Sequence, residues 1–110
     1  MELSKKDKKA ARDVIELGLQ REFVSGLSNV DAILQAWKTK AKDNKETYHQ
    51  LYKHIITLDK HIAHRYDDIT VSRYLLTIIG QMRDNVIHDE DLVEFSEEVQ
   101  LYLRGIIKSF

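Results

Sequence analysis

One short run near the end of this chain, from Arg83 to His88, carries residue types that could do chemistry. His88 carries an imidazole, which titrates near neutral pH and can therefore pass a proton in either direction. Arg83 carries a permanent positive charge on a forked set of donors, which suits it to an anionic group. These residue types indicate proton transfer beside a negatively charged group.

A second group of polar residues follows helical spacing earlier in the chain: His49, His54, His61, His64, Asp67 and Asp68. His61 with His64, or His64 with Asp68, could reach one metal ion, whereas His54 and His61 are separated by roughly 10 Å of helix. Two or three ligands do not complete a site, and the Glu-x-x-His pair of di-iron bundles is absent. We therefore expect solvated histidines beside a core stripe, with no bound metal or cofactor.

The sequence lacks the motifs of several other functional classes. Four glycines, at positions 18, 26, 80 and 105, cannot build a phosphate-binding loop, and no Gly-x-Ser-x-Gly nucleophile elbow occurs. The lysine and glycine that follow the histidine of phosphotransfer domains are missing after His54 and after His61. The run from Arg83 to His88 is therefore the remaining candidate.

In this run Arg83 is followed directly by the polar Asp84 and five residues later by His88, which resembles the signature of the HEPN superfamily. The resemblance covers about residues 78–103, and the earlier helices are similar only in being helices. Members of that superfamily are compact helical bundles, many of them metal-independent ribonucleases of toxin or defence systems, often dimeric with the motif facing across the interface. Others bind nucleotides or partner a nucleotidyltransferase. Here Asp89 and Glu90 follow the histidine, where the family often has an aromatic residue.

The resemblance implies a catalytic site of Arg83, Asp84 and His88. His88 would act as base or acid, Arg83 would stabilise the charge on the scissile phosphate, and Asp84 or Asn85 would orient His88 or the sugar. Residues five apart on a continuous helix point about 140° away from each other, so the site requires the helix to end near Val86. The apolar stripe favours continuation and a cap at residue 89 favours a break, and the sequence leaves both open.

Apolar residues recur every three or four positions along almost the whole chain, which contains no proline. This pattern predicts an all-α fold, an up-and-down bundle of four to five amphipathic helices in a single domain over residues 1–110. We expect helices over residues 4–25, 28–43 and 44–67, with Gly26 ending the first, and two more from residues 70 and 89, the last reaching Phe110. The capping residues would be Ser4, Ser28, Asn44, Thr70 and Asp89.

The first of these helices carries a second apolar stripe with a spacing of four. A helix that is apolar on two sides is usually sandwiched, either by neighbours in the same chain or by a second copy. We expect a homodimer through this stripe, with another protein as a possible partner. The stripe consists of Ile15, Leu19, Phe23 and Leu27.

The composition limits the functional classes further. A net charge of −1 argues against a dedicated nucleic-acid-binding domain, so RNA is a partner only if the ribonuclease prediction holds. The absence of cysteine excludes disulfides and thiolate sites, and no apolar run is long enough to span a membrane. We expect a soluble, cytoplasmic protein that acts through self-association or partner binding. The alternative is a HEPN-like ribonuclease or an inactive nucleotide-binding relative.

Overall fold

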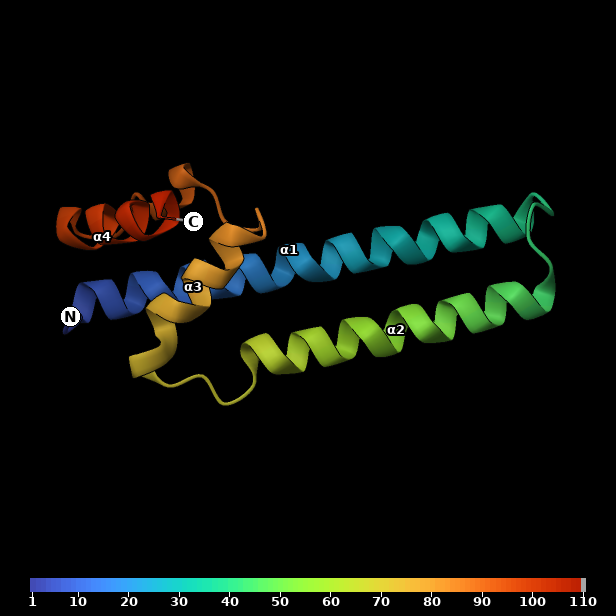
Figure 1. Cartoon of the computed structure of the whole chain (residues 1–110), viewed down its shortest axis with the longest axis horizontal. Coiled ribbons are helices and arrows are strands. Elements are labelled where there is room, and N and C mark those ends of the chain that lie inside the picture. Colours follow the sequence, from blue (N-terminus) through green and yellow to red (C-terminus); the bar gives the residue numbers. More distant parts are fainter. Residues whose placement is uncertain (110) are drawn as a thin grey trace. The chain divides into compact units, whose positions relative to one another are not determined.

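The computed structural model describes residues 1–109 and consists of four α-helices joined by turns (Figure 1). No strand occurs between residues 1 and 109, so the all-α prediction is confirmed. No helix in that range is long and apolar enough to cross a bilayer. Phe110, the predicted end of the last helix, lies outside the described residues. The helices are α1 Lys5–Lys38, α2 Asn44–Tyr66, α3 Tyr74–Arg83 and α4 Glu97–Lys108, with 3-10 turns at Val71–Arg73 and Asp89–Leu92.

The chain divides into two compact units, which we name the core unit and the hairpin. The core unit consists of Met1–Arg21 and the chain from Asp68 onward, and the hairpin consists of Glu22–Asp67. Helix α1 contributes its first half to the core unit and its second half to the hairpin. The single domain over residues 1–110 stays a prediction.

The core unit has a sealed apolar interior. Side chains from the first half of α1, from α3, from the loop that follows α3 and from α4 all enter it. Ile78, Leu92 and Leu103 have no exposed surface at all, as expected for positions on the apolar stripes. The buried apolar set includes Ala11, Val14, Ile15, Ile78, Ile79, Ile87, Leu92, Phe95, Val99 and Leu103.

Helix α4 starts at a serine cap that is held by the first helix. The backbone N–H and the hydroxyl of Ser96 both donate to the carboxylate of Asp7, at 2.7 Å each, and Asp7 is only 4% exposed. Burial by itself raises the pKa of Asp7, but the hydrogen bonds from Ser96 outweigh it and lower the pKa below its ordinary value. The predicted helix start at Asp89 is wrong, because Asp89 begins only a short turn from which Leu92 enters the core.

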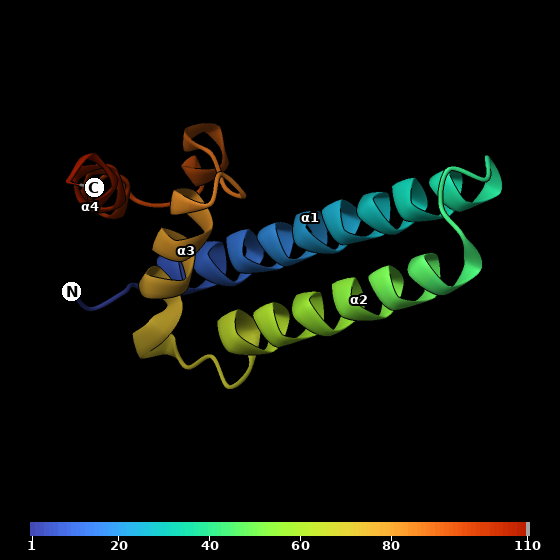
Figure 2. The ribbon, with the colours of Figure 1, turned by 45° about the vertical axis from the view of Figure 1, so that its right-hand side comes forward.

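The hairpin consists of the second half of α1 and the whole of α2, which run side by side in opposite directions in both ribbon views (Figures 1 and 2). Helix α1 continues through Gly26, so the predicted break and the separate helix over residues 28–43 are wrong. A Cβ at Gly26 would lie 2.4 Å from Cδ2 of Leu58. The glycine therefore serves the close approach of the two helices and does not end the first one.

Helix α2 lies within about one residue of its prediction at each end. Its N-cap is Asp43 instead of Asn44, since Oδ1 of Asp43 accepts the backbone N–H of Glu46 at 2.7 Å. The turn before the helix thus supplies the acceptor that its first free N–H groups need.

Candidate functional site

Helix α3 ends at Arg83, ahead of His88, in a turn that glycine usually closes. Asn85 adopts the left-handed conformation with a φ of 58°. The N–H of Val86 donates to the carbonyl of Gln81 (2.8 Å), and the N–H of Asn85 donates to the next carbonyl along the chain (3.1 Å). These are the two bonds of a Schellman motif, in which asparagine can replace glycine. Of the two alternatives that the sequence left open, the structure has the break.

Asp91 fixes the loop that carries His88. Its Oδ2 accepts the backbone N–H of His88 at 2.8 Å, and its two oxygens accept from the guanidinium of Arg21 at 2.6 and 3.1 Å. The same guanidinium donates to the carbonyl of Val86 at 2.9 Å. The hydrogen bond from Arg21 lowers the pKa of Asp91, while burial opposes it. The sequence reasoning missed both residues. The His88-x-x-Asp91 spacing, typical of a side-chain-to-backbone turn, is a signal that could have identified Asp91, whereas no local pattern identifies Arg21.

The three predicted catalytic residues, Arg83, Asp84 and His88, are all exposed. His88 lines an open cavity of about 480 Å³, and Arg83 is not among the residues that line it. Two cations of α4, Arg104 and Lys108, share this cavity with His88. The cavity is lined by Met82, Asn85, Ile87, His88, Asp89, Arg104, Ile107 and Lys108.

Two side-chain hydrogen bonds hold Arg104 in place. Its Nε donates to Oδ1 of Asp89 at 2.5 Å, and its Nη2 donates to Oε1 of Gln100 at 2.9 Å. An acid directly after His88 therefore takes up part of the positive charge in the cavity. His88 thus shares its cavity with Arg104, which is paired with Asp89, and with Lys108.

Two of the four hairpin histidines join the helices to each other. Nε2 of His54 lies 3.1 Å from the carbonyl of Gly26, and Nε2 of His61 lies 2.6 Å from Oε1 of Glu22. Nη1 of Arg65 donates to the same Glu22 oxygen at 3.2 Å, and the hydroxyl of Tyr66 donates to Oε2. Among residues 1–109 no three histidine, aspartate or glutamate side chains lie close enough to hold a metal ion.

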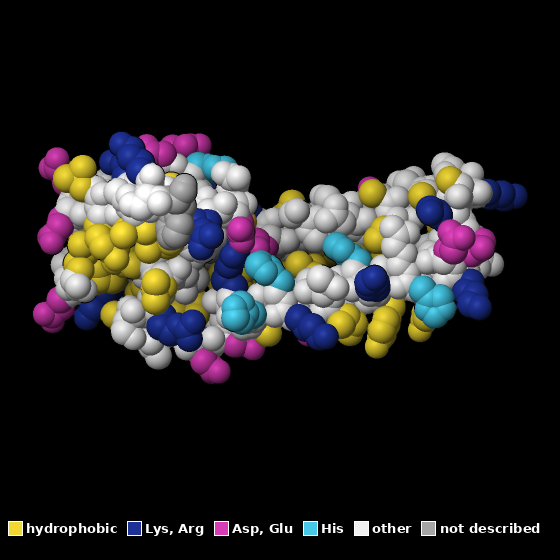
Figure 3. All heavy atoms as spheres, viewed as in Figure 1, with side chains coloured by type: hydrophobic (Ala, Val, Ile, Leu, Met, Phe, Trp, Pro, Cys, Tyr) yellow, Lys and Arg dark blue, Asp and Glu magenta, His cyan; other side chains and the backbone are white. Residues whose placement is uncertain are grey.

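The hairpin has no sealed apolar interior. All of its residues are described, and only Gly26 and Thr47 are buried. Large apolar side chains are instead exposed on both of its helices, and in Figure 3 they stand out along the edge formed by α2. We name five of them the apolar face: Phe23, Leu27, Tyr48, Tyr52 and Ile55.

The apolar face lies on one side of the hairpin. Gly26 of α1 and His54 of α2 mark the contact between the helices. Leu27 and Ile55 are the next residues in each helix, so their side chains are rotated by about 100° around the helix axis from that contact. Because the helices face each other and run in opposite directions, the same turn brings both side chains to the same side. Phe23 follows the inward-facing Glu22 in the same way.

The opposite side of the hairpin is polar. Each residue that comes directly before an inward-facing position is rotated about 100° in the opposite sense, and so points to this other side. They are exposed and carry hydroxyl or amino groups: Ser25, Lys53, Thr57 and Lys60. A hairpin with one apolar and one polar side has the pattern of half a four-helix bundle.

The predicted dimer stripe is divided between the two units. Ile15 is buried in the core unit and Leu19 is half-buried there. Phe23 and Leu27 lie in the hairpin, where they are 39% and 65% exposed. Only the second half of the predicted stripe is therefore open to a partner.

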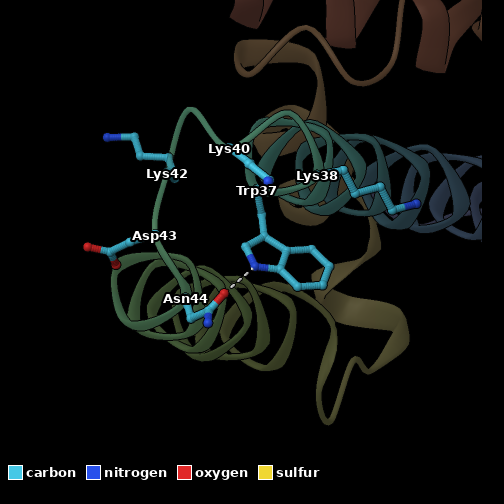
Figure 4. A pocket seen from close by; sticks show the side chains of 6 residues that line it. All are labelled: Trp37, Lys38, Lys40, Lys42, Asp43 and Asn44. Carbon is cyan, nitrogen blue, oxygen red and sulfur yellow. Dashed lines mark hydrogen bonds between the residues drawn. The ribbon is translucent and has the colours of Figure 1, made fainter.

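Four of the six lysines of the hairpin lie at or beside its tip: Lys38, Lys40, Lys42 and Lys45. Figure 4 shows the indole of Trp37 reaching across to Asn44, and its Nε1 donates to Oδ1 of Asn44 at 2.7 Å. Lys38, Lys40 and Lys42 extend away from one another around this contact. The tip is therefore a closed turn with a positively charged rim.

Comparison with known proteins adds nothing to this geometry, since no family model, curated protein or solved structure matches the chain.

Proposed function

We propose that this protein works by self-association through the apolar face of its hairpin. The observation that carries the proposal is that the hairpin buries no apolar side chain while five large ones are exposed on one side. Two antiparallel helices of this kind gain little by folding alone, because burial of apolar surface is the main favourable term in folding. A partner that covers the face supplies the missing burial.

The size of the apolar face fits this role. Phe23, Leu27, Tyr48, Tyr52 and Ile55 together expose about 500 Å² per copy, given the area that such side chains typically bury. Two such faces in contact would bury about 1,000 Å², to which flanking polar residues add. The total approaches the 1,200–2,000 Å² typical of specific protein interfaces.

The test compares two acidic substitutions on either side of Gly26. Leu27→Asp places a charge on the apolar face, and Ser25→Asp places the same charge on the polar side of the same helix. We expect sedimentation velocity to show a dimer for the parent protein and for Ser25→Asp, with at least about 100-fold weaker association for Leu27→Asp. A parent protein that sediments as a monomer at about 100 μM would refute the proposal.

Metal-independent RNA cleavage is a second candidate, supported by the end of α3 at Arg83. The Asn85 turn frees His88 from the helix, as the HEPN-like site requires. His88 would move the proton, Arg83 would face the phosphate, and Asp84 would orient the histidine or the sugar.

The ribonuclease candidate is tested with His88→Ala and a matched control, His64→Ala, which removes an exposed histidine of the hairpin. With a chelator present, His88→Ala should lose at least about 100-fold of the cleavage rate while His64→Ala keeps it. Circular dichroism should give the parent helicity for both variants. Absence of cleavage by the parent protein would eliminate this candidate.

A further inference from the structure

We infer that two copies of the hairpin dock antiparallel, tip against base, and form an intermolecular four-helix bundle in which Tyr48 of each copy faces Asp59 of the other. The inference rests on the proposed self-association and specifies its geometry. Two hairpins that face each other can be related by a two-fold axis along their helices or across them. The first gives a parallel pair with adjoining tips, and the second gives an antiparallel pair.

The charge at the hairpin tip disfavours the parallel pair. Lys38, Lys40, Lys42 and Lys45 lie at or beside the tip together with the acids Asp43 and Glu46, the latter 3.6 Å from Lys42, so four positive and two negative charges leave a net charge of +2. Adjoining tips would bring the two lysine sets together, where like charges repel. In the antiparallel pair about 15 Å of helix separates each tip from the two-fold axis, which leaves the tips about 30 Å apart.

The position of Asp59 favours the antiparallel pair as well. Asp59 follows the inward-facing Leu58 by one residue, so it lies on the same side as the apolar face. In a parallel pair α2 packs on the partner's α1 at the same level, which places this carboxylate against the ring of Phe23. A carboxylate buried against an aromatic ring without a donor is strongly unfavourable.

In an antiparallel pair α2 packs on the α2 of the second copy. The exposed apolar residues of α2 are centred near Tyr52 and Ile55, so we place the two-fold axis there. This axis brings Asp59 of one copy to the same height along the helices as Tyr48 of the other copy. The hydroxyl of Tyr48, a side chain that is 65% exposed in the single chain, can then donate to the carboxylate. Each end of the interface thus pairs an acceptor with a donor, as a two-fold contact requires.

The absence of cysteine makes this geometry directly testable, since any introduced thiol can pair only with its own copy in a second chain. Ile55→Cys places a thiol near the axis of the antiparallel pair, and Ala41→Cys places one in the turn at the tip. A disulfide requires Cα atoms within about 7 Å. Under mild oxidation we expect at least tenfold more covalent dimer from Ile55→Cys than from Ala41→Cys, both in the full chain.

Every outcome of this experiment bears on the inference. Covalent dimer from Ala41→Cys but not from Ile55→Cys would establish the parallel pair and overturn it. A protein that sediments as a dimer while neither thiol pairs would overturn the antiparallel geometry and leave the proposed self-association standing. A monomeric parent protein would overturn the self-association itself, and the apolar face would then belong to a different protein.

Discussion

The two halves of helix α1 are covalently continuous, yet they serve opposite kinds of structure. In the core unit the first half buries Ala11, Val14 and Ile15, whereas in the hairpin the second half exposes Phe23 and Leu27. Helix propensity and length do not distinguish the halves, since both belong to one 34-residue helix. The difference lies in packing, and it indicates which half is complete within a single chain.

The hairpin compensates for its open side with polar contacts between its helices. The carboxylate of Glu22 accepts from His61, Arg65 and Tyr66, and His54 reaches the backbone of Gly26. Such bonds fix the register of two helices, and each contributes a net stability of about 1 kcal/mol, or up to about 3 kcal/mol where one partner is charged. The hairpin is therefore aligned without being tightly closed, and its large apolar side chains are left for another surface.

The comparison of the two units predicts its largest effect for a matched pair of isoleucines. Ile78→Ala removes a fully buried side chain of the core unit and should lower the free energy of unfolding by about 2–5 kcal/mol. Ile55→Ala removes a side chain that is 44% exposed and should cost less than about 1 kcal/mol in dilute, monomeric protein. Urea denaturation measures both, and equal losses would contradict the distinction between the units.

A smaller effect is expected at the two glycines of α1. A Cβ at Gly18 would lie 2.1 Å from Nε2 of Gln81, a buried amide that donates to the carbonyl of Ile15, so Gly18→Ala should cost about 2 kcal/mol. Gly26→Ala meets only the end of the half-buried Leu58 side chain, which can move, and should cost less.

Gly105→Ala is the control for both glycine variants, because a Cβ at Gly105 meets nothing within 4 Å. It should raise the free energy of unfolding by up to about 1 kcal/mol through the better helix propensity of alanine. Thermal melts of the three variants should therefore rank Gly105→Ala highest and Gly18→Ala lowest. A lower melting temperature for Gly26→Ala than for Gly18→Ala would reverse the predicted order of the units.

The smallest effect is a pH dependence that belongs to the core unit. The pKa of Asp7 is lower in the folded chain than its ordinary value of 3.8, so its contribution is complete above that value and is lost as the pH falls through the folded pKa. Asp7→Asn should cost about 1 kcal/mol at pH 7, and its difference from the parent should shrink below about pH 4. Asp13→Asn, which removes an exposed acid of the same helix, should cost less than about 0.5 kcal/mol at either pH. A deficit of Asp7→Asn that persists at pH 3 would contradict the assignment.

The sequence predicted the features that local patterns determine. Ser4 caps α1 through its hydroxyl, which accepts the N–H of Asp7 at 3.1 Å, and the apolar stripes correctly placed Ile78, Ile79 and Val99 in the core. Gly26 was misinterpreted because a glycine that ends a helix and one that admits a neighbouring helix look alike in sequence. The difference is the presence of Leu58, which only the tertiary structure brings there.

The candidate site was likewise predictable only where a local pattern determined it. The spacing of Arg83 and His88 required a loop before His88 but left helix continuation open, and the structure ends α3 at Arg83 with a left-handed turn at Asn85. The neighbours of His88, by contrast, come from elsewhere in the chain: Arg21 holds its loop through Asp91, and Arg104 shares its cavity. No local pattern links residues so far apart in the sequence.

If the hairpin self-associates as proposed, its lack of a sealed interior would make the integrity of this protein depend on its abundance. At low copy number the segment from Glu22 to Asp67, in which only two residues are buried, would open more easily to proteases than the core unit. As the chain accumulates, the proposed pairing would withdraw those helices from attack, because anything that binds only the folded form stabilises it by mass action. The lifetime of the molecule would then lengthen with its own concentration.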